Sequence, residues 1–174
     1  RTRLSFSSAA LRLGAYLITM ENGAVSSSLH KGETIEDTTR IVNGYADAII
    51  MRHPQEGSAG KAGLVSNVPV INAGDGGNEH PTQALIDLYT IRKNLGRLTD
   101  LKVAFGFDPL HSRSIKSLCR ILAIFPNNHL VFISPESLEP SPEFIKELEK
   151  TGIKFEIRNT LEKVDEVDVL YTNR

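Results

Sequence analysis

The sequence predicts an α/β protein built from two units, each with a parallel sheet. Short apolar runs typical of buried strands alternate with segments of helical spacing, and this alternation is typical of parallel sheets covered by helices. The 174 residues, 40% of them apolar, suffice for one large core or two small ones. A polar link, GRLTDLK, interrupts the alternation, so we place the units at residues 1–96 and 97–174.

The first unit opens with a helical pattern, LSFSSAALRLG, and then alternates strands with helices. The expected strands cover residues 15–20, 46–52 and 68–74, and the expected helices cover residues 32–45, 56–65 and 81–95. The last helix is the strongest. Pro81 suits its first turn, where no N–H is needed, and Gly96 suits the position after its end.

The second unit repeats the alternation. The expected strands cover residues 101–107, 129–134, 153–158 and 167–173. The expected helices cover residues 112–125 and 141–152, with a short one near 160–165. In the first of these helices Ile115, Leu118 and Leu122 recur at three- and four-residue steps, which indicates one buried face.

Composition and motifs exclude several classes of function. The net charge is −1 and there is no basic run, which argues against a nucleic-acid surface. The sequence contains no stretch of roughly 18 apolar residues, so we expect no membrane span. Cys119 is the only cysteine and lies in an apolar run, so we expect a core thiol in a reducing, cytoplasmic protein.

The histidines and glycines give no sign of a cofactor. His30, His53, His111 and His129 lack the spacing of metal ligands, so we expect no metal site. The glycine-rich stretch before residue 81 contains no G-x-G-x-x-G, the fingerprint of dinucleotide binding. We therefore do not expect this stretch to bind a dinucleotide.

Polar side chains gather where the predicted strands end. In open α/β sheets ligands bind beyond the carboxyl ends of the strands. The residues at these ends, or at the start of the chain, are Arg1, Thr2, Arg3, Arg52, His80, Arg113, Asn173 and Arg174. Arginine and helix N-termini both suit phosphate and carboxylate, so this set predicts a site for an anion with several oxygens.

Each of these residues also has a structural interpretation. The arginines at the start of the chain could be solvated charges. Arg52 could pair with a nearby acid such as Asp75, and His80 could merely cap the helix that follows it. Gln83, one step inside that helix, could be a surface residue. Only the combination favours a site.

Several stretches together resemble the catalytic chain of the aspartate carbamoyltransferases. They are RTRLSF, SSLHKGETIEDT, DAIIMRHPQEGSA, NAGDGGNEHPTQALIDLYTI, HSRS and VDVLYTNR, in the order of that family and over essentially the whole chain. The resemblance implies a carbamoyl phosphate-binding domain in residues 1–96 and an aspartate-binding domain in residues 97–174. It implies carbamoyl transfer to the α-amine of L-aspartate, in pyrimidine biosynthesis, without a cofactor.

The resemblance also implies roles on the carbamoyl phosphate side. Arg1 and Thr2 match the end of the family's phosphate-binding loop. Arg52 matches an arginine that contacts both the phosphate and the carbonyl oxygen. His80 matches the histidine that hydrogen-bonds this carbonyl oxygen, and Gln83 matches the group that holds the carbamoyl nitrogen.

Further matches concern aspartate and the neighbouring subunit. Arg113 and Arg174 match arginines that grip the aspartate carboxylates. Ser27, or Ser28 if the alignment slips by one, and Lys31 match a loop that enters the active site of the adjacent subunit. A homotrimer with shared active sites is therefore expected, and regulatory chains are left open as further partners.

The sequence also departs from the family. Residues 107–110 read Phe-Asp-Pro-Leu where Gly-Asp and a polar pair are usual, and Asn173 replaces a threonine. The family's first helices and the end of its aspartate domain have no counterpart, so we expect this piece alone to be inactive. Two alternatives stay open: a transcarbamoylase with another acceptor, such as ornithine, and a non-catalytic paralogue that assembles with or regulates an active enzyme.

Overall fold

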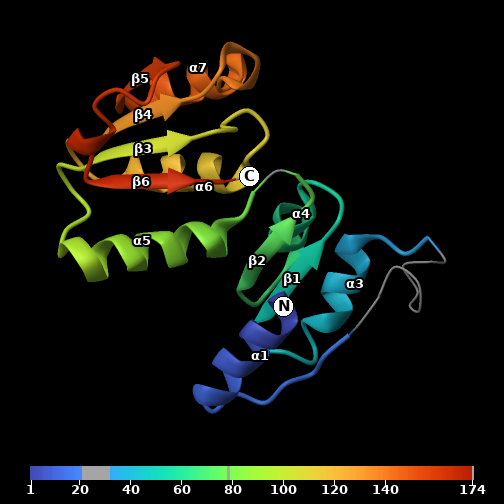
Figure 1. Cartoon of the computed structure of the whole chain (residues 1–174). Coiled ribbons are helices and arrows are strands. Elements are labelled where there is room, and N and C mark those ends of the chain that lie inside the picture. The colour runs from blue at the N-terminus through green and yellow to red at the C-terminus, as the bar shows by residue number, and fades with distance from the viewer. Residues whose placement is uncertain (21–31, 78, 174) are drawn as a thin grey trace. The chain divides into compact units, whose positions relative to one another are not determined.

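A computed structural model describes residues 1–20, 32–77 and 79–173 of the chain. The chain forms two compact units, Arg1–Asn78 and Glu79–Arg174 (Figure 1). Helix α5 (Pro81–Leu95) packs against helix α6 (Arg113–Leu122), so the packing boundary falls before α5. The division predicted between residues 96 and 97, into a carbamoyl phosphate-binding domain and an aspartate-binding domain, stays a prediction.

The described residues of the first unit form a two-stranded parallel sheet and three helices. Strand β1 (Ile49–His53) pairs with β2 (Val70–Asp75), with Ile49 opposite Val70. The register shifts between Met51 and His53, where the strands approach their carboxyl ends. The helices are α1 (Thr2–Arg12), α3 (Ile35–Val42) and α4 (Ser58–Val65). These elements confirm the predicted alternation from residue 32 onward.

The strand predicted at residues 15–20 is wrong. This segment has no regular secondary structure, and Tyr16 and Ile18 are 101% and 80% exposed. A strand needs a neighbour for its backbone hydrogen bonds, and the sheet described for this unit contains only β1 and β2. An apolar run alone therefore did not suffice to form a strand.

The second unit holds a four-stranded sheet in the order β5-β4-β3-β6, with every pair parallel. The strands are β3 (Lys102–Gly106), β4 (His129–Ile133), β5 (Lys154–Arg158) and β6 (Val169–Thr172). Helices α5, α6 and α7 (Pro142–Thr151) connect or precede them, with 3₁₀ turns η2 (Glu136–Leu138) and η3 (Val164–Glu166). The helix predicted at 160–165 is only the short turn η3.

The core of the second unit lies between one face of the sheet and its three helices. Phe105 of β3 and Phe132 of β4 are fully buried there, with ring centroids 5.6 Å apart. Leu88 of α5, Leu118 of α6 and Leu148 of α7 pack into the same cluster. The opposite face carries a smaller cluster formed by Ala104, Val131 and Ile133. Burial on both faces explains why β3 and β4 read as continuous apolar runs.

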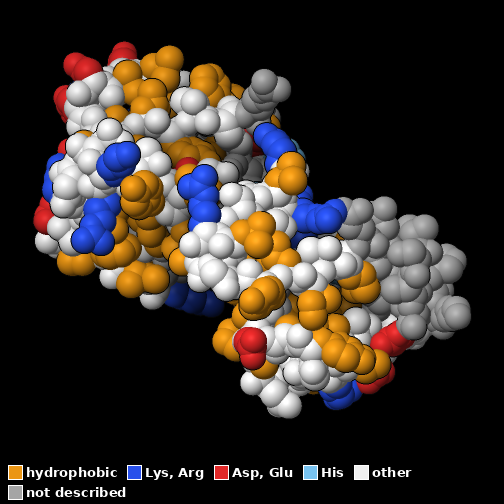
Figure 2. Space-filling view, turned by 90° about the horizontal axis from the view of Figure 1, so that it is seen from below, with side chains coloured by type: hydrophobic (Ala, Val, Ile, Leu, Met, Phe, Trp, Pro, Cys, Tyr) orange, Lys and Arg blue, Asp and Glu red, His pale blue; other side chains and the backbone are white. Residues whose placement is uncertain are grey.

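The ends of α5 follow the predicted signals. Pro81 occupies the first turn, and Gly96 ends the helix with a φ of 74°, a left-handed conformation that glycine adopts without strain. The outer face of this helix is apolar: Leu85, Ile86 and Tyr89 are 57%, 58% and 66% exposed. Figure 2 shows hydrophobic side chains exposed over one face of the molecule.

Candidate functional site

In the first unit, Thr2 and Arg52 meet at the carboxyl ends of the strands. The Arg52 guanidinium donates to the Thr2 hydroxyl over 2.5 Å, although the two residues are 50 positions apart. Gly74 of β2 lies beside them, since a Cβ placed on it would be 4.0 Å from Arg52 Cζ. The first turn of α1 carries no acidic side chain. Helix N–H groups, a hydroxyl and a guanidinium thus face one place, a combination that suits a phosphate.

The structural alternatives for the arginines of this unit receive mixed support. Asp75 accepts a hydrogen bond from the backbone N–H of Gly57 at 3.0 Å, and its other oxygen is buried without a partner among the described residues. Arg52 contacts Thr2 instead of forming the alternative pair with Asp75. Arg1 is the exposed N-cap of α1, and Arg3 is also exposed.

In the second unit, His80 caps α5 through its imidazole. Its Nδ1 accepts a hydrogen bond from the backbone N–H of Gln83 at 3.3 Å. The capping interpretation of His80 is therefore confirmed. The cap also has a chemical consequence, because a neutral imidazole whose Nδ1 accepts carries its proton on Nε2. His80 can then donate from Nε2 to an oxygen of a ligand.

Gln83 lies one turn inside the same helix and contacts Asp87. Its Nε2 donates to Asp87 Oδ1 at 2.9 Å. The other oxygen of Asp87 is buried without a hydrogen-bond partner among the described residues, and burial raises the pKa of this carboxyl. Burial also raises the pKa of the neighbouring Tyr171, whereas a hydrogen bond with Ser114 lowers it. Gln83 is thus anchored and is not a freely moving surface residue.

Arg113 begins helix α6, directly after its N-cap. The hydroxyl of Ser112 accepts from the backbone N–H of Ile115 and so caps the helix. Shortly before it, Phe107 has a φ of 79°, and Asp108 accepts hydrogen bonds from the N–H and the ring of His111. The departure at residues 107–110 therefore includes a phenylalanine in a conformation that favours glycine.

The remaining predicted site residues lie outside the described part of the chain. They are Ser27 with its alternative Ser28, Lys31 and Arg174. Asn173, beside Arg174, is described, and its side-chain oxygen is buried without a partner among the described residues.

Neither a metal-binding cluster nor a membrane-spanning helix is found among the described residues. Within residues 1–20, 32–77 and 79–173, no three His, Cys, Asp or Glu side chains are arranged to hold a metal ion. Over the same residues, no helix combines the length and apolarity needed to cross a membrane.

The sequence matches a known family over its first half. Residues 1–93 match the family described as "Aspartate/ornithine carbamoyltransferase, carbamoyl-P binding domain". The chain belongs to the aspartate/ornithine carbamoyltransferase family. The aspartate carbamoyltransferase catalytic subunit of Methanocaldococcus jannaschii is 47% identical over 175 residues. The chloroplastic aspartate carbamoyltransferase of Arabidopsis thaliana is 46% identical over the same length.

Solved structures of this carbamoyltransferase family have the same fold. The M. jannaschii catalytic subunit matches 98% of this chain with a TM-score of 0.86 at 46% identity. Aspartate transcarbamoylase from Trypanosoma cruzi, solved in complex with carbamoyl phosphate and aspartate, matches 99% with a TM-score of 0.84 at 33% identity. The chain covers 57% of the M. jannaschii protein and 45% of the A. thaliana protein, about half the length of these relatives.

Sequence reasoning missed the residues that support the predicted site. Asp87 could have been found, because it follows Gln83 by four positions on a helix, the spacing at which side chains meet. Ser117 and Arg120 of α6 could not, since they contact His80 and Glu79 across 37 and 41 residues. No local pattern indicates such a contact.

Proposed function

We propose that the protein carrying this chain transfers the carbamoyl group of carbamoyl phosphate to the α-amine of L-aspartate. The products are N-carbamoyl-L-aspartate and phosphate, in de novo pyrimidine biosynthesis. The observation that carries the proposal is the cap of α5, where His80 Nδ1 accepts from Gln83 N–H. This cap directs the histidine's remaining proton to Nε2, where it can serve a carbonyl oxygen.

The proposed chemistry needs a preorganised donor more than a nucleophile of the protein. The aspartate amine attacks the carbamoyl carbon, the carbonyl oxygen gains negative charge, and the bond to the phosphate oxygen then breaks. The departing phosphate takes the proton that the amine loses. A donor already fixed toward the developing oxyanion is commonly worth about 10²–10³ in rate. His80 fits this role because α5 holds its ring before substrate binds.

The other predicted residues have different proposed roles in the two units. Arg1, Thr2 and Arg52 are proposed to bind the phosphate, and the hydrogen bond between Thr2 and Arg52 supports this. Arg52 and Thr2 are also proposed to donate to the carbonyl oxygen as it gains negative charge. Gln83 is proposed to accept from the carbamoyl nitrogen. Arg113 and Arg174 are proposed to bind the two carboxylates of aspartate, which an ornithine-type acceptor would not require.

Assembly and location are proposed from the resemblance alone. Ser27 and Lys31 would act in the active site of an adjacent subunit, so we propose a cytoplasmic homotrimer, and regulatory chains stay open as further partners. Light scattering of the full-length protein tests the subunit number. A monomer with full activity would contradict the shared site.

The decisive test offers the full-length protein labelled carbamoyl phosphate with aspartate or with ornithine. We expect carbamoyl-aspartate and no citrulline. We also expect Arg52→Ala to raise the KM for carbamoyl phosphate and to lower kcat. Product from ornithine only would keep the family and overturn the acceptor. Binding of carbamoyl phosphate without turnover would favour a non-catalytic paralogue and direct attention to residues 107–110.

A further inference from the structure

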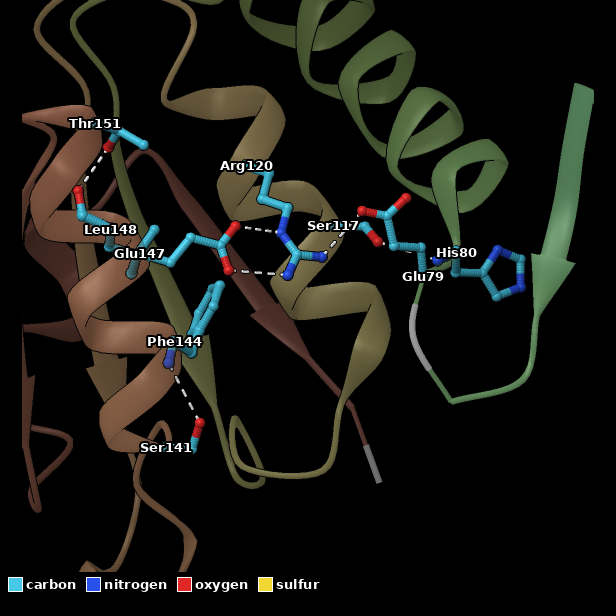
Figure 3. Close-up of polar contacts among 9 residues, drawn as sticks. All are labelled: Glu79, His80, Ser117, Arg120, Ser141, Phe144, Glu147, Leu148 and Thr151. Atoms are coloured by element: carbon cyan, nitrogen blue, oxygen red, sulfur yellow. Dashed lines mark hydrogen bonds and ion pairs between the residues drawn. The ribbon is translucent and has the colours of Figure 1, made fainter. Parts of the chain in front are cut away.

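Arg120 of α6 joins three segments that are far apart in the sequence. Its Nε and one terminal nitrogen donate to the two oxygens of Glu147 on α7, at 2.6 and 2.9 Å. Its other terminal nitrogen donates to Glu79 at 3.2 Å. Its guanidinium carbon lies 5.8 Å from the centre of the Phe144 ring. Figure 3 shows Arg120 between Glu147 and Glu79.

These contacts fix the orientation of the guanidinium. A guanidinium is planar, so the two-pronged contact with Glu147 sets the plane and the direction of the remaining nitrogen. Phe144 lies within the range of a cation–π contact. The hydrogen bonds with Arg120 hold the pKa of Glu147 below its ordinary value, which keeps this anchor ionised. The third nitrogen of Arg120 is thereby directed at Glu79.

Glu79 immediately precedes His80, and α6 holds this pair from two sides. Arg120 binds the side chain of Glu79, and the Ser117 hydroxyl accepts from the backbone N–H of His80 at 3.0 Å. Ser117 and Arg120 are three residues apart on α6, so they lie on the same face of the helix. The backbone that leads into the His80 cap is therefore tied to α6 at consecutive residues.

We propose that Arg120 is a positioning residue, which sets the placement of the His80 imidazole through its contact with Glu79. The inference rests on the proposed function, in which His80 stabilises the developing oxyanion. Arg120 is the one cation that both Glu79 and Glu147 contact among the described residues. Without it two carboxylates lose their shared partner, and the segment before α5 loses its side-chain anchor.

The variants separate positioning from simple bracing of helices. Glu79→Ala removes the anchor and leaves the Arg120–Glu147 brace between α6 and α7 intact. Glu79→Gln keeps an oxygen that can accept from Arg120. Arg120→Met removes both contacts. Arg158→Met is the matched control, because it breaks another part-buried ion pair of the same unit, with Glu156 on β5.

Kinetics of the full-length protein give the first reading. We expect kcat to fall about tenfold in Glu79→Ala and in Arg120→Met, since small misplacements of a catalytic group cost one to two orders of magnitude in rate. The KM values should change less than twofold. Glu79→Gln should keep most of the wild-type rate. The double variant Glu79→Ala/Arg120→Met should be no slower than the slower of the two single variants. A full rate in Glu79→Ala would overturn the proposal, leaving Arg120 as a brace.

A second reading does not depend on turnover. NMR of histidine-labelled protein, with the His80 signal identified by its loss in His80→Ala, reports the ring directly. We expect this signal to shift in Glu79→Ala and to stay in place in Glu79→Gln and Arg158→Met. An unmoved signal in Glu79→Ala overturns the positioning role. A wild-type protein that makes no carbamoyl-aspartate overturns the proposed function, and the NMR result then still decides whether Glu79 positions His80.

Discussion

The side-chain amide of Gln83 donates to the carboxylate of Asp87, four residues later on helix α5, over 2.9 Å. An amide presents a donor at one end and an acceptor at the other. One N–H of the NH₂ group is bound by Asp87, which turns the nitrogen end of the amide toward this carboxylate and leaves the oxygen end able to accept from a ligand. A carbamoyl nitrogen carries hydrogens to donate, so this orientation suits the role proposed for Gln83.

Asp87→Asn should therefore weaken the use of carbamoyl phosphate. The new side chain can donate as well as accept, so it no longer dictates which end of Gln83 faces outward. We expect kcat/KM for carbamoyl phosphate to fall about tenfold, the value of one hydrogen bond of roughly 1.4 kcal/mol. Steady-state kinetics measure this, and an unchanged kcat/KM would show that Asp87 does not orient Gln83.

The same substitution should stabilise the fold at neutral pH. Burial raises the pKa of Asp87 above that of the unfolded chain, so the folded state holds this proton more tightly. The wild type thus loses stability as the pH rises through the raised pKa, and Asp87→Asn does not. Melting temperatures from acidic to neutral pH should show an advantage of Asp87→Asn that grows with pH. A constant difference at all pH values would contradict the burial argument.

Gly76→Ala should destabilise the loop after β2. An added Cβ would lie 2.7 Å from the carbonyl oxygen of Pro54 and 2.8 Å from Glu56 Cγ, so backbone must move. Overpacking of this kind costs about 1–3 kcal/mol of unfolding free energy, measured by denaturant titration. Gly60→Ala in α4 is the control, since its Cβ meets open space and should instead gain about 0.5–1 kcal/mol. Equal effects would argue against the clash.

At position 107 a glycine variant should be more stable than an alanine variant, the reverse of the usual order of stability. Its φ of 79° is left-handed, and its side chain is 59% exposed. Phe107→Ala and Phe107→Gly remove the same aromatic ring. Only glycine adopts the left-handed conformation without strain, and this strain costs other residues about 1–2 kcal/mol. We expect the glycine variant to be the more stable by denaturant titration. A more stable alanine variant would contradict the strained backbone.

The second unit could be read from the sequence more fully than the first. Helix α5 begins at Pro81 and ends before Gly96, as predicted, because both signals are local backbone chemistry. The strand predicted at residues 15–20 does not form, because an apolar run forms a strand only where another strand can pair with it. Pairing partners are a property of the fold, and composition does not encode them.

The sequence predicts the residues of the candidate site better than the residues that hold them in place. His80 follows the end of a predicted strand, and Gln83 lies just inside the helix that comes next, so both positions are visible in the sequence. Their supports Ser117 and Arg120 lie on another helix, and tertiary packing alone brings them to the start of α5. The capping and catalytic interpretations of His80 also looked exclusive in the sequence. In the structure the cap on Nδ1 is what makes Nε2 a donor.

The central claim is that His80 donates to the carbonyl oxygen as the amine attacks. Its most direct test is the kcat of His80→Ala in the full-length protein, with saturating carbamoyl phosphate and aspartate. We predict a fall of about 10²–10³, the usual effect of removing one oxyanion donor, with a much smaller change in the affinity for carbamoyl phosphate. A kcat within a few-fold of wild type would contradict the claim and leave His80 only as the cap of α5.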